Sequence, residues 1–463
     1  MKKVNSKAGD YLAVPKKQYK NLRIDDFFKG ADGRLDQSVL SPKAAAETYN
    51  FDFSSGALKD GLGVTGIGVA GLPVTNIWRF VKNIDNVGEI VMFSSLLGDV
   101  FYIKNGVQSL HITLPGRIYT ANYRLHGTEV VLMWTENSPI AVWDGVNAAY
   151  FITDSPNIKS MDICGDFAFI AESDGQTIRY TDELDPINWN TDFGGGILTP
   201  AEGSGRVGKV MSLMGHLYVF KDFSVSRVSI SGSGGVPKAA GNHIFGGRIF
   251  FDTVALCGNK IMFLSGDGLW EFDGLTAKKV LSNIAGIMPS ESACAAYHGG
   301  RYHLAVQYAF GGVPVGCETA NHLNNALITY VPSDGSYTLS RGMDITSMAA
   351  GDDAMYVVCG GNAGRLSPLA QVFSAPLLKL WKSPLSDLGS ERIKFLREIH
   401  IDTAGAIVLT VDNGAESKSV QVDGSPQPQR VRVGMRGRKL SFCIESNETN
   451  ACVARPVLVY SEV

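Results

Sequence analysis

A phrase of two short strands joined by a tight turn constrains the fold of this chain more than any other feature. It is clearest in "LWEFDGLTAKKV", residues 269–280, where apolar and polar residues alternate on both sides of Asp273-Gly274. Alternation with a period of two predicts a half-buried strand, and Asp-Gly is a preferred hairpin turn. Similar phrases occur at residues 89–106, 129–145, 165–183, 209–223, 260–274, 301–335 and, more weakly, 353–369.

The spacing of these phrases is close to forty residues. The interval is 39 residues from Gly106 to Gly145 and 38 residues from Gly145 to Glu183, and later intervals are longer because they contain insertions. A repeat of this length, with two clear strands and room for two more, is typical of a β-propeller blade. The pattern predicts an all-β chain with a six- or seven-bladed β-propeller at residues 76–372. A pair of large β-sandwiches is the alternative.

The segments on either side of the repeats have different patterns. Residues 1–75 mix charges, isolated aromatics and turn residues, which predicts an extended N-terminal arm or docking segment. Within the arm, residues 41–51 favour a helix, with Ser41 as N-cap and Pro42 at the first helical position. Residues 373–463 contain about five alternating runs and an Asn-Gly turn, which predict a small antiparallel β-sandwich or barrel. The arm could pack on this C-terminal domain, because chain ends often lie close together.

Composition excludes several classes of protein. The chain has 42 Lys and Arg against 45 Asp and Glu, a net charge of −3, so it does not grip nucleic acid over its whole surface. None of the seven cysteines belongs to a CxxC pair, so neither a zinc site nor a disulfide framework is expected. No apolar run is long enough to predict a membrane span, and the first residues do not form a secretory signal.

No motif in the chain predicts catalysis. "GSGRVGKV", residues 203–210, matches a phosphate-binding loop in its glycines and Lys209, but Val210 stands where a Ser or Thr must reach magnesium. His298 and His303 have no third metal ligand near them in the sequence, and no nucleophile elbow is present. We therefore expect no enzyme activity, no catalytic residues, no cofactor and no metal site.

The stretch "RVRVGMRGRKLSF", residues 430–442, is the most charged segment with a clear geometry. It predicts two strands joined by a glycine-containing turn, with Arg430 and Arg432 on one face. Such a basic strip can meet an acidic partner subunit or phosphates, or it can be a solvated sheet face. Lysines of the arm could dock in the same way. The candidate interface residues are Arg430, Arg432, Arg436, Arg438, Lys439, Lys16 and Lys17.

Three segments of the chain resemble virion proteins of tailed bacteriophages. They are "NFDFSSGALKDGLGV" (50–64), "IRYTDELDPINWN" with its Asp-Pro-x-x-Trp line (178–190), and the C-terminal run that contains "FLREIHIDTAGAIVLTVDNG" and "PVLVYSE" (395–462). Together with the repeats, they are similar to tail hub or nozzle proteins, including packaged-DNA stabilisation proteins of short-tailed phages.

This resemblance implies a structural role in a ring, often of six copies, beneath the portal and adaptor. The partners that it implies are other copies of the chain, portal, adaptor and tail-fibre proteins, and passing DNA that is contacted without sequence specificity. The sandwich-like part would build the channel, and the propellers would project outward. The implied location is the virion tail, which is assembled in the host cytoplasm.

Two other functions fit the same fold. A β-propeller at a cell surface can bind or cleave glycans, and tryptophans could then stack on sugars, although buried blade aromatics are the ordinary alternative. A propeller can also serve as a scaffold for protein partners inside a cell. The tryptophans in question are Trp78, Trp134, Trp143, Trp189, Trp270 and Trp381.

Overall fold

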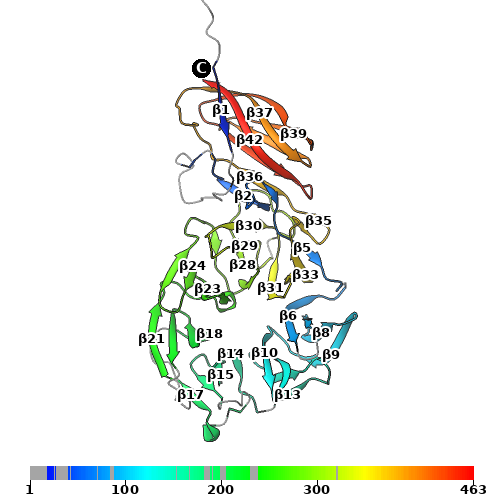
Figure 1. The fold of residues 1–463 in the computed structure, drawn as a ribbon, viewed down its shortest axis with the longest axis vertical. Coiled ribbons are helices and arrows are strands. Elements are labelled where there is room, and N and C mark those ends of the chain that lie inside the picture. Colours follow the sequence, from blue (N-terminus) through cyan, green and yellow to red (C-terminus); the bar gives the residue numbers. More distant parts are fainter. Residues whose placement is uncertain are drawn as a thin grey trace, which may run out of the picture.

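The computed structural model shows an all-β chain with a ring of small sheets and two further sheets at one end (Figure 1). Apart from two short 3-10 turns, η1 (Thr191–Phe193) and η2 (Phe251–Thr253), every regular element in the described part is a strand. No helix of that part is long and apolar enough to cross a membrane. The structure describes residues 18–24, 27, 40–41, 43–69, 71–83, 88–152, 154–165, 167–181, 188–189, 191–198, 205–229, 238–319 and 322–462.

Between residues 63 and 376 the described strands form seven sheets. Five of these sheets contain four consecutive strands paired antiparallel in chain order, as the repeated hairpin phrase predicts. The first sheet contains β6 (Val74–Lys82), β7 (Gly88–Ser95), β8 (Asp99–Ile103) and β9 (Val107–Thr113), and the second contains β10 (Tyr119–Leu125), β11 (Thr128–Trp134), β12 (Ile140–Trp143) and β13 (Tyr150–Ile152). The third contains β14 (Ile158–Cys164), β15 (Phe167–Glu172), β16 (Ile178–Tyr180) and β17 (Gly196–Leu198), and the fourth contains β18 (Val207–Leu213), β19 (His216–Lys221), β20 (Ser224–Ser229) and β21 (Lys238–Ile244). The fifth contains β22 (Ala255–Cys257), β23 (Lys260–Ser265), β24 (Gly268–Phe272) and β25 (Ala277–Val280).

The last two of the seven sheets have additional strands, and one of them uses a strand from the N-terminal segment. That strand, β5 (Gly63–Gly66), comes before the first sheet in the sequence but pairs antiparallel with β33 (Asn362–Ser367) of the seventh. The two ends of this region are thus joined within one sheet. The sixth sheet contains β26 (Ile287–Met288), β27 (Cys294–His298), β28 (Arg301–Tyr308), β29 (Ala326–Tyr330) and β30 (Tyr337–Arg341), and the seventh contains β31 (Ile345–Ala350), β32 (Met355–Cys359), β33 (Asn362–Ser367), β5 (Gly63–Gly66), β34 (Gln371–Val372) and β35 (Ala375–Pro376).

Each of these sheets packs on the next through a buried apolar cluster. Phe80 and Met133 belong to the cluster between the first and second sheets, and comparable clusters join every following pair. The series returns to its start, because Phe93 of the first sheet shares a cluster with Val358 of the seventh. Each fully buried large side chain contributes roughly 1.5–3 kcal/mol to folding. This circular packing of small four-stranded sheets confirms the predicted all-β, β-propeller-like fold.

The recurring Asp-Gly turn has one construction in several sheets. In the turn between β24 and β25, Asp273 Oδ1 accepts hydrogen bonds from the backbone N–H groups of Leu275 and Thr276, at 2.8 and 2.7 Å. The Thr276 hydroxyl donates to Asp273 Oδ2 at 2.9 Å. These bonds hold the pKa of Asp273 below its ordinary value. Asp144 and Asp174 make the corresponding backbone contacts in the second and third sheets.

Two larger sheets lie beyond the ring and share one apolar core. Each sheet is completed by a strand from the N-terminal segment, and this segment also contributes buried side chains such as Phe51 and Leu58 to the core. A two-stranded hairpin, β3 (Phe51–Asp52) and β4 (Lys59–Asp60), follows the second of these strands. One sheet has the order β1 (Tyr19–Arg23), β42 (Cys452–Glu462), β37 (Lys394–Ala404) and β40 (Gln429–Gly437), and the other has β2 (Glu47–Tyr49), β36 (Lys379–Lys382), β41 (Ser441–Ser446), β38 (Ile407–Asp412) and β39 (Ser417–Val422).

The helix expected at residues 41–51 is wrong. In its place the chain forms β2 and enters β3, with Asn50 between them in the left-handed region at φ 60°. Tyr49 and Phe51 are buried, and β2 pairs with β36 of the larger sheet. Burial of these aromatic side chains and the pairing with β36 override the helical preference of the alanines, which is weak by comparison.

A buried polar junction joins the ring to the two larger sheets. Asn50 Nδ2 donates to the carbonyl oxygens of Leu378 and Arg341, at 2.8 and 3.1 Å, and its Oδ1 accepts from the Arg341 N–H at 2.8 Å. The Arg341 guanidinium is itself buried, donates to Glu318 Oε2 at 2.8 Å and stacks over the ring of Phe310. Because every polar group here has a partner, the junction is expected to orient the two parts rigidly.

Candidate functional site

The predicted basic strip lies on the outer face of an edge strand. Arg430, Arg432 and Arg436 are exposed on β40, whereas Val431 and Met435 between them point into the core shared by the two larger sheets. All three arginines stand on this one strand, which continues through Gly434 rather than turning there. Arg438 and Lys439 are exposed in the connection to β41, and Lys16 and Lys17 lie outside the described residues.

The strand register extends this strip across the whole four-stranded sheet. One row of paired residues runs from Arg23 on β1 through Val457 and His400 to Arg430 on β40. The next row runs from Asn21 through Val459 and Glu398 to Arg432, and the third runs from Tyr19 through Ser461 and Phe395 to Arg436. We call the outward surface made by Arg23, Arg430, Arg432 and Arg436 the arginine face.

The carboxylates on this surface are already engaged. Glu398 Oε1 lies 3.0 Å from His400 Nε2, and this contact, together with the positive charges of Arg397 and Arg430, lowers the pKa of Glu398. Asp402 pairs with Arg455 at 2.9 Å. Within the described part of the chain, the four members of the arginine face form no ion pair. The outer surface of this sheet therefore carries a net positive charge, although the whole chain is slightly acidic.

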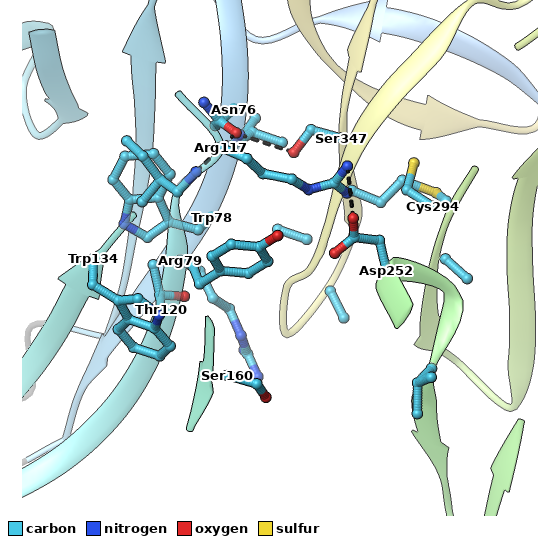
Figure 2. A pocket seen from close by; sticks show the side chains of 18 of the residues that line it. Asn76, Trp78, Arg79, Arg117, Thr120, Trp134, Ser160, Asp252, Cys294 and Ser347 are labelled. Carbon is cyan, nitrogen blue, oxygen red and sulfur yellow. Dashed lines mark hydrogen bonds and ion pairs between the residues drawn. The ribbon is translucent and has the colours of Figure 1, made fainter. Parts of the chain in front are cut away.

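A second candidate site is a cavity of about 430 Å³ where the first strands of the seven sheets meet (Figure 2). Arg117, just before β10 of the second sheet, and Asp252, in η2 before β22 of the fifth, form an ion pair of 3.0 Å across it. A smaller pocket of about 80 Å³ shares Lys209 and Asp252 with this cavity. The ion pair therefore connects opposite parts of the ring at its centre.

Hydrogen bonds at the rim of the cavity join neighbouring sheets. Asn76 Oδ1 accepts from the Ile118 N–H at 3.2 Å, which links the first sheet to the second. Ser347 Oγ accepts from the Ile77 N–H at 3.2 Å, which links the seventh sheet to the first. Both residues line the cavity, as Figure 2 shows. The hydrogen bonds of Asn76 and Ser347 therefore help to hold neighbouring sheets of the ring together.

Burial shifts the pKa of two groups that line the cavity, Lys209 and Cys294. Burial lowers the pKa of Lys209, against the attraction of the Asp252 and Asp162 carboxylates. Burial also raises the pKa of Cys294 to about 12, so its thiol is protonated at neutral pH and is a poor nucleophile. No group of three or more metal-binding side chains occurs among the residues that the structure describes.

The tryptophans considered for sugar stacking mostly belong to the core. Trp78, Trp134, Trp143, Trp189 and Trp381 are each buried to at least nine-tenths. Trp270 is partly exposed, but its Nε1 donates to Ser265 Oγ and Asp267 Oδ1, both at 3.0 Å. These six side chains do not present the row of exposed aromatic faces on which a glycan stacks.

Sequence reasoning identified the β40 arginines but missed Arg23 and the cavity. Arg23 lies about four hundred residues earlier in the chain, in the arm, and nothing local indicates that β1 will pair with β42. Arg117 and Asp252 are ordinary charged residues in loops between hairpins. Only an alignment of the repeats to a common position could have indicated that both stand just before the first strand of a sheet.

Comparison with known proteins does not identify a family for this chain. No family model and no curated protein matches the chain. Among solved structures, it is similar to the extracellular domain of a hybrid two component system from B. thetaiotaomicron, with 13% identity, a TM-score of 0.42, and coverage of 68% of this chain and 40% of that one. It is also similar to PorZ, a bacterial surface component of the type-IX secretion system of Porphyromonas gingivalis, with 12% identity, a TM-score of 0.42, and coverage of 78% and 46%. The computationally designed protein Ika8 matches with 13% identity, a TM-score of 0.39, and coverage of 65% and 98%.

Proposed function

We propose that this chain is a structural subunit of a ring in the tail of a bacteriophage, where it acts as a hub or nozzle protein. The observation that carries the proposal is the contact between two segments that resemble such proteins. Leu58, in the N-terminal segment, forms a reciprocal backbone bridge with Val453, in the C-terminal one, with N–O distances of 2.9 and 2.8 Å. Two stretches at opposite ends of the sequence thus form one structural unit, which supports reading the resemblance as shared architecture rather than as scattered short matches.

The finer architecture belongs to the same proposal. We take the seven sheets of residues 63–376 as the seven blades of a closed propeller, in which β5 completes the last blade. We take the two larger sheets as a β-sandwich formed by the C-terminal region together with the N-terminal segment. This division refines the boundaries expected at residues 75 and 373, because β5 joins the propeller and β1 and β2 join the sandwich.

In this proposal DNA passes between copies of the chain and not through the propeller. A cavity of about 430 Å³ has the size of a small-molecule site, and the Arg117–Asp252 pair crosses it. The sandwiches, which carry the arginine face, would surround the channel, and the propellers would contact portal, adaptor and fibre proteins. The role is structural, located in the virion tail after assembly in the host cytoplasm, and involves no catalysis.

Averaged electron microscopy of native particles, combined with crosslinking of the chain in those particles, tests the proposal. We expect a ring of identical subunits around a channel wide enough for DNA, with crosslinks between copies that involve the sandwich. Recovery of the chain only as a cellular monomer, with none in purified particles, would refute it. Copy number and position along the tail are read from the same maps.

A further inference from the structure

We propose that the arginine face contacts the phosphate backbone of duplex DNA. The inference rests on the proposed function for the presence of DNA beside the sandwich. The charge and geometry that it uses come from the sheet alone. Its residues are Arg23 on one edge strand and Arg430, Arg432 and Arg436 on the other.

Unpaired charge is the first argument. Among the described residues of this sheet, Glu398 pairs with His400 and Asp402 with Arg455, and none of the four arginines forms an ion pair, although Arg430 also acts electrostatically on Glu398. Within the described part of the chain, four guanidinium groups without an ion-pair partner therefore share one surface of a protein whose net charge is −3. This local concentration of positive charge attracts a polyanion such as DNA, because binding releases the counterions that are condensed on the DNA.

Spacing is the second argument. Residues two apart on a strand are separated by about 7 Å, and three strand spacings place β1 about 14 Å from β40. One strand of DNA presents a phosphate for each 3.4 Å of rise, so about four phosphates lie within that width. Long arginine side chains can reach phosphates over this range, and the planar guanidinium can form two hydrogen bonds with each.

The centre of the surface favours DNA over a protein partner. Stable protein interfaces have an apolar centre depleted in charged residues. Here the middle of the sheet carries Glu398 and His400 beside Val457, Val459 and Phe395, so its centre is not purely apolar. The four arginines extend from strands of a sheet, so the contact should be made to phosphates and should not depend on base sequence.

Fluorescence anisotropy of the purified full chain with two labelled DNA duplexes of unrelated sequence tests the proposal. We expect equal affinities for both duplexes and a linear fall of log affinity with log salt. The triple variant R430Q/R432Q/R436Q should reduce the magnitude of the salt slope by about 2.7, since each lost phosphate contact removes about 0.9. The matched control R124Q/K104Q/K278Q removes three exposed cations of the ring and should keep the slope.

The outcomes separate this inference from the proposed function. The inference is overturned if the wild-type chain does not bind DNA, or if the triple variant and the control reduce the salt slope equally. The ring in the particle is tested separately, by microscopy. Tighter binding of polyglutamate than of DNA would assign the face to an acidic protein instead. If the triple variant unfolds, the single variants R23Q and R430Q replace it, and each should reduce the slope by about 0.9. An unchanged slope in both overturns the inference.

Discussion

Lys379 Nζ and Asp60 Oδ1 meet at 2.6 Å in the interior, where both side chains are almost completely buried. The pair connects β36 to the N-terminal hairpin, and Asp60 Oδ2 also accepts from the Asn450 N–H at 2.6 Å. Lys379 further donates to the Glu448 carbonyl oxygen. Three distant segments of the chain are therefore held by one buried ion pair, and this arrangement attaches the N-terminal segment to the larger sheets.

Removal of one partner of this pair should be strongly destabilising. We expect Lys379→Met to lower the free energy of unfolding by about 3–5 kcal/mol, because Asp60 is left charged and buried without its partner. The double variant K379M/D60N should lose less than the sum of the single losses. Chemical denaturation measures both. Lys382→Met, on the same strand but partly exposed, is the control and should change stability by less than about 0.5 kcal/mol. Strict additivity of the two changes would contradict the pairing.

Closure of the ring depends on a position where only glycine fits. A Cβ on Gly63 of β5 would lie 2.1 Å from the Leu369 carbonyl oxygen and 2.2 Å from that of Gln371. We expect Gly63→Ala to cost about 1–3 kcal/mol, as overpacking usually does. At Gly66 on the same strand, an added Cβ meets nothing closer than 3.8 Å, so Gly66→Ala is the matched control.

Limited proteolysis and thermal unfolding distinguish these two glycine variants. Gly63→Ala should expose the segment around β5 to cleavage, while Gly66→Ala should behave as the unmodified chain. Equal behaviour of both variants would show that β5 does not close the seventh sheet. The comparison is direct because both changes remove the same backbone freedom from the unfolded chain.

Buried His303 should make the protein sensitive to acid. Burial, aided by Arg301 and His298, lowers the pKa of His303 from 6.5 to about 3. Between these values the unfolded chain binds a proton that the folded chain does not, so stability decreases as the pH falls through this window. The loss should approach about 1.4 kcal/mol for each pH unit for this residue.

His303→Asn tests this pH dependence. Asparagine can keep a hydrogen bond to Thr329 Oγ1, which lies 3.1 Å from His303 Nδ1, but it does not titrate. The variant should show a smaller decline of stability between pH 6 and pH 4 than the unmodified chain, as measured by denaturation at each pH. His126→Asn, at an exposed turn position of the second sheet that is not among the groups acting on His303, is the control. Parallel pH profiles for the H303N variant and the unmodified chain would contradict the assignment.

The recurring Asp turn should contribute measurably to each hairpin. Asp273→Ala removes two backbone hydrogen bonds and one hydroxyl bond, and we expect a loss of about 1 kcal/mol. Because the folded pKa of Asp273 is lowered, its contribution is present above the unfolded pKa and is lost as the pH falls below it. Asp353→Ala, an exposed aspartate outside such a turn, should be nearly neutral in thermal unfolding. A neutral D273A variant would show that the turn geometry forms without its side chain.

The amino-acid sequence by itself determined the hairpins of this protein. Asp273-Gly274 and its counterparts act over three or four residues, and the alternation of apolar residues acts along one strand, so both signals can be read locally. From them the all-β, propeller-like arrangement was predictable, as was the exposed side of β40. The repeat length also placed most of the sheets in order.

Only the tertiary structure decided which distant strands pair. β5 joins β33, β1 joins β42 and β2 joins β36, each over a separation of about three hundred residues or more. Strands β2 and β3 formed where a helix was expected for the same reason, because burial against a distant sheet outweighs a local helical preference. Arg23 reaches the arginine face, and Arg117 reaches Asp252, only through such pairing and ring closure. Non-local contacts depend on the burial of whole surfaces, and no short stretch of sequence contains that information.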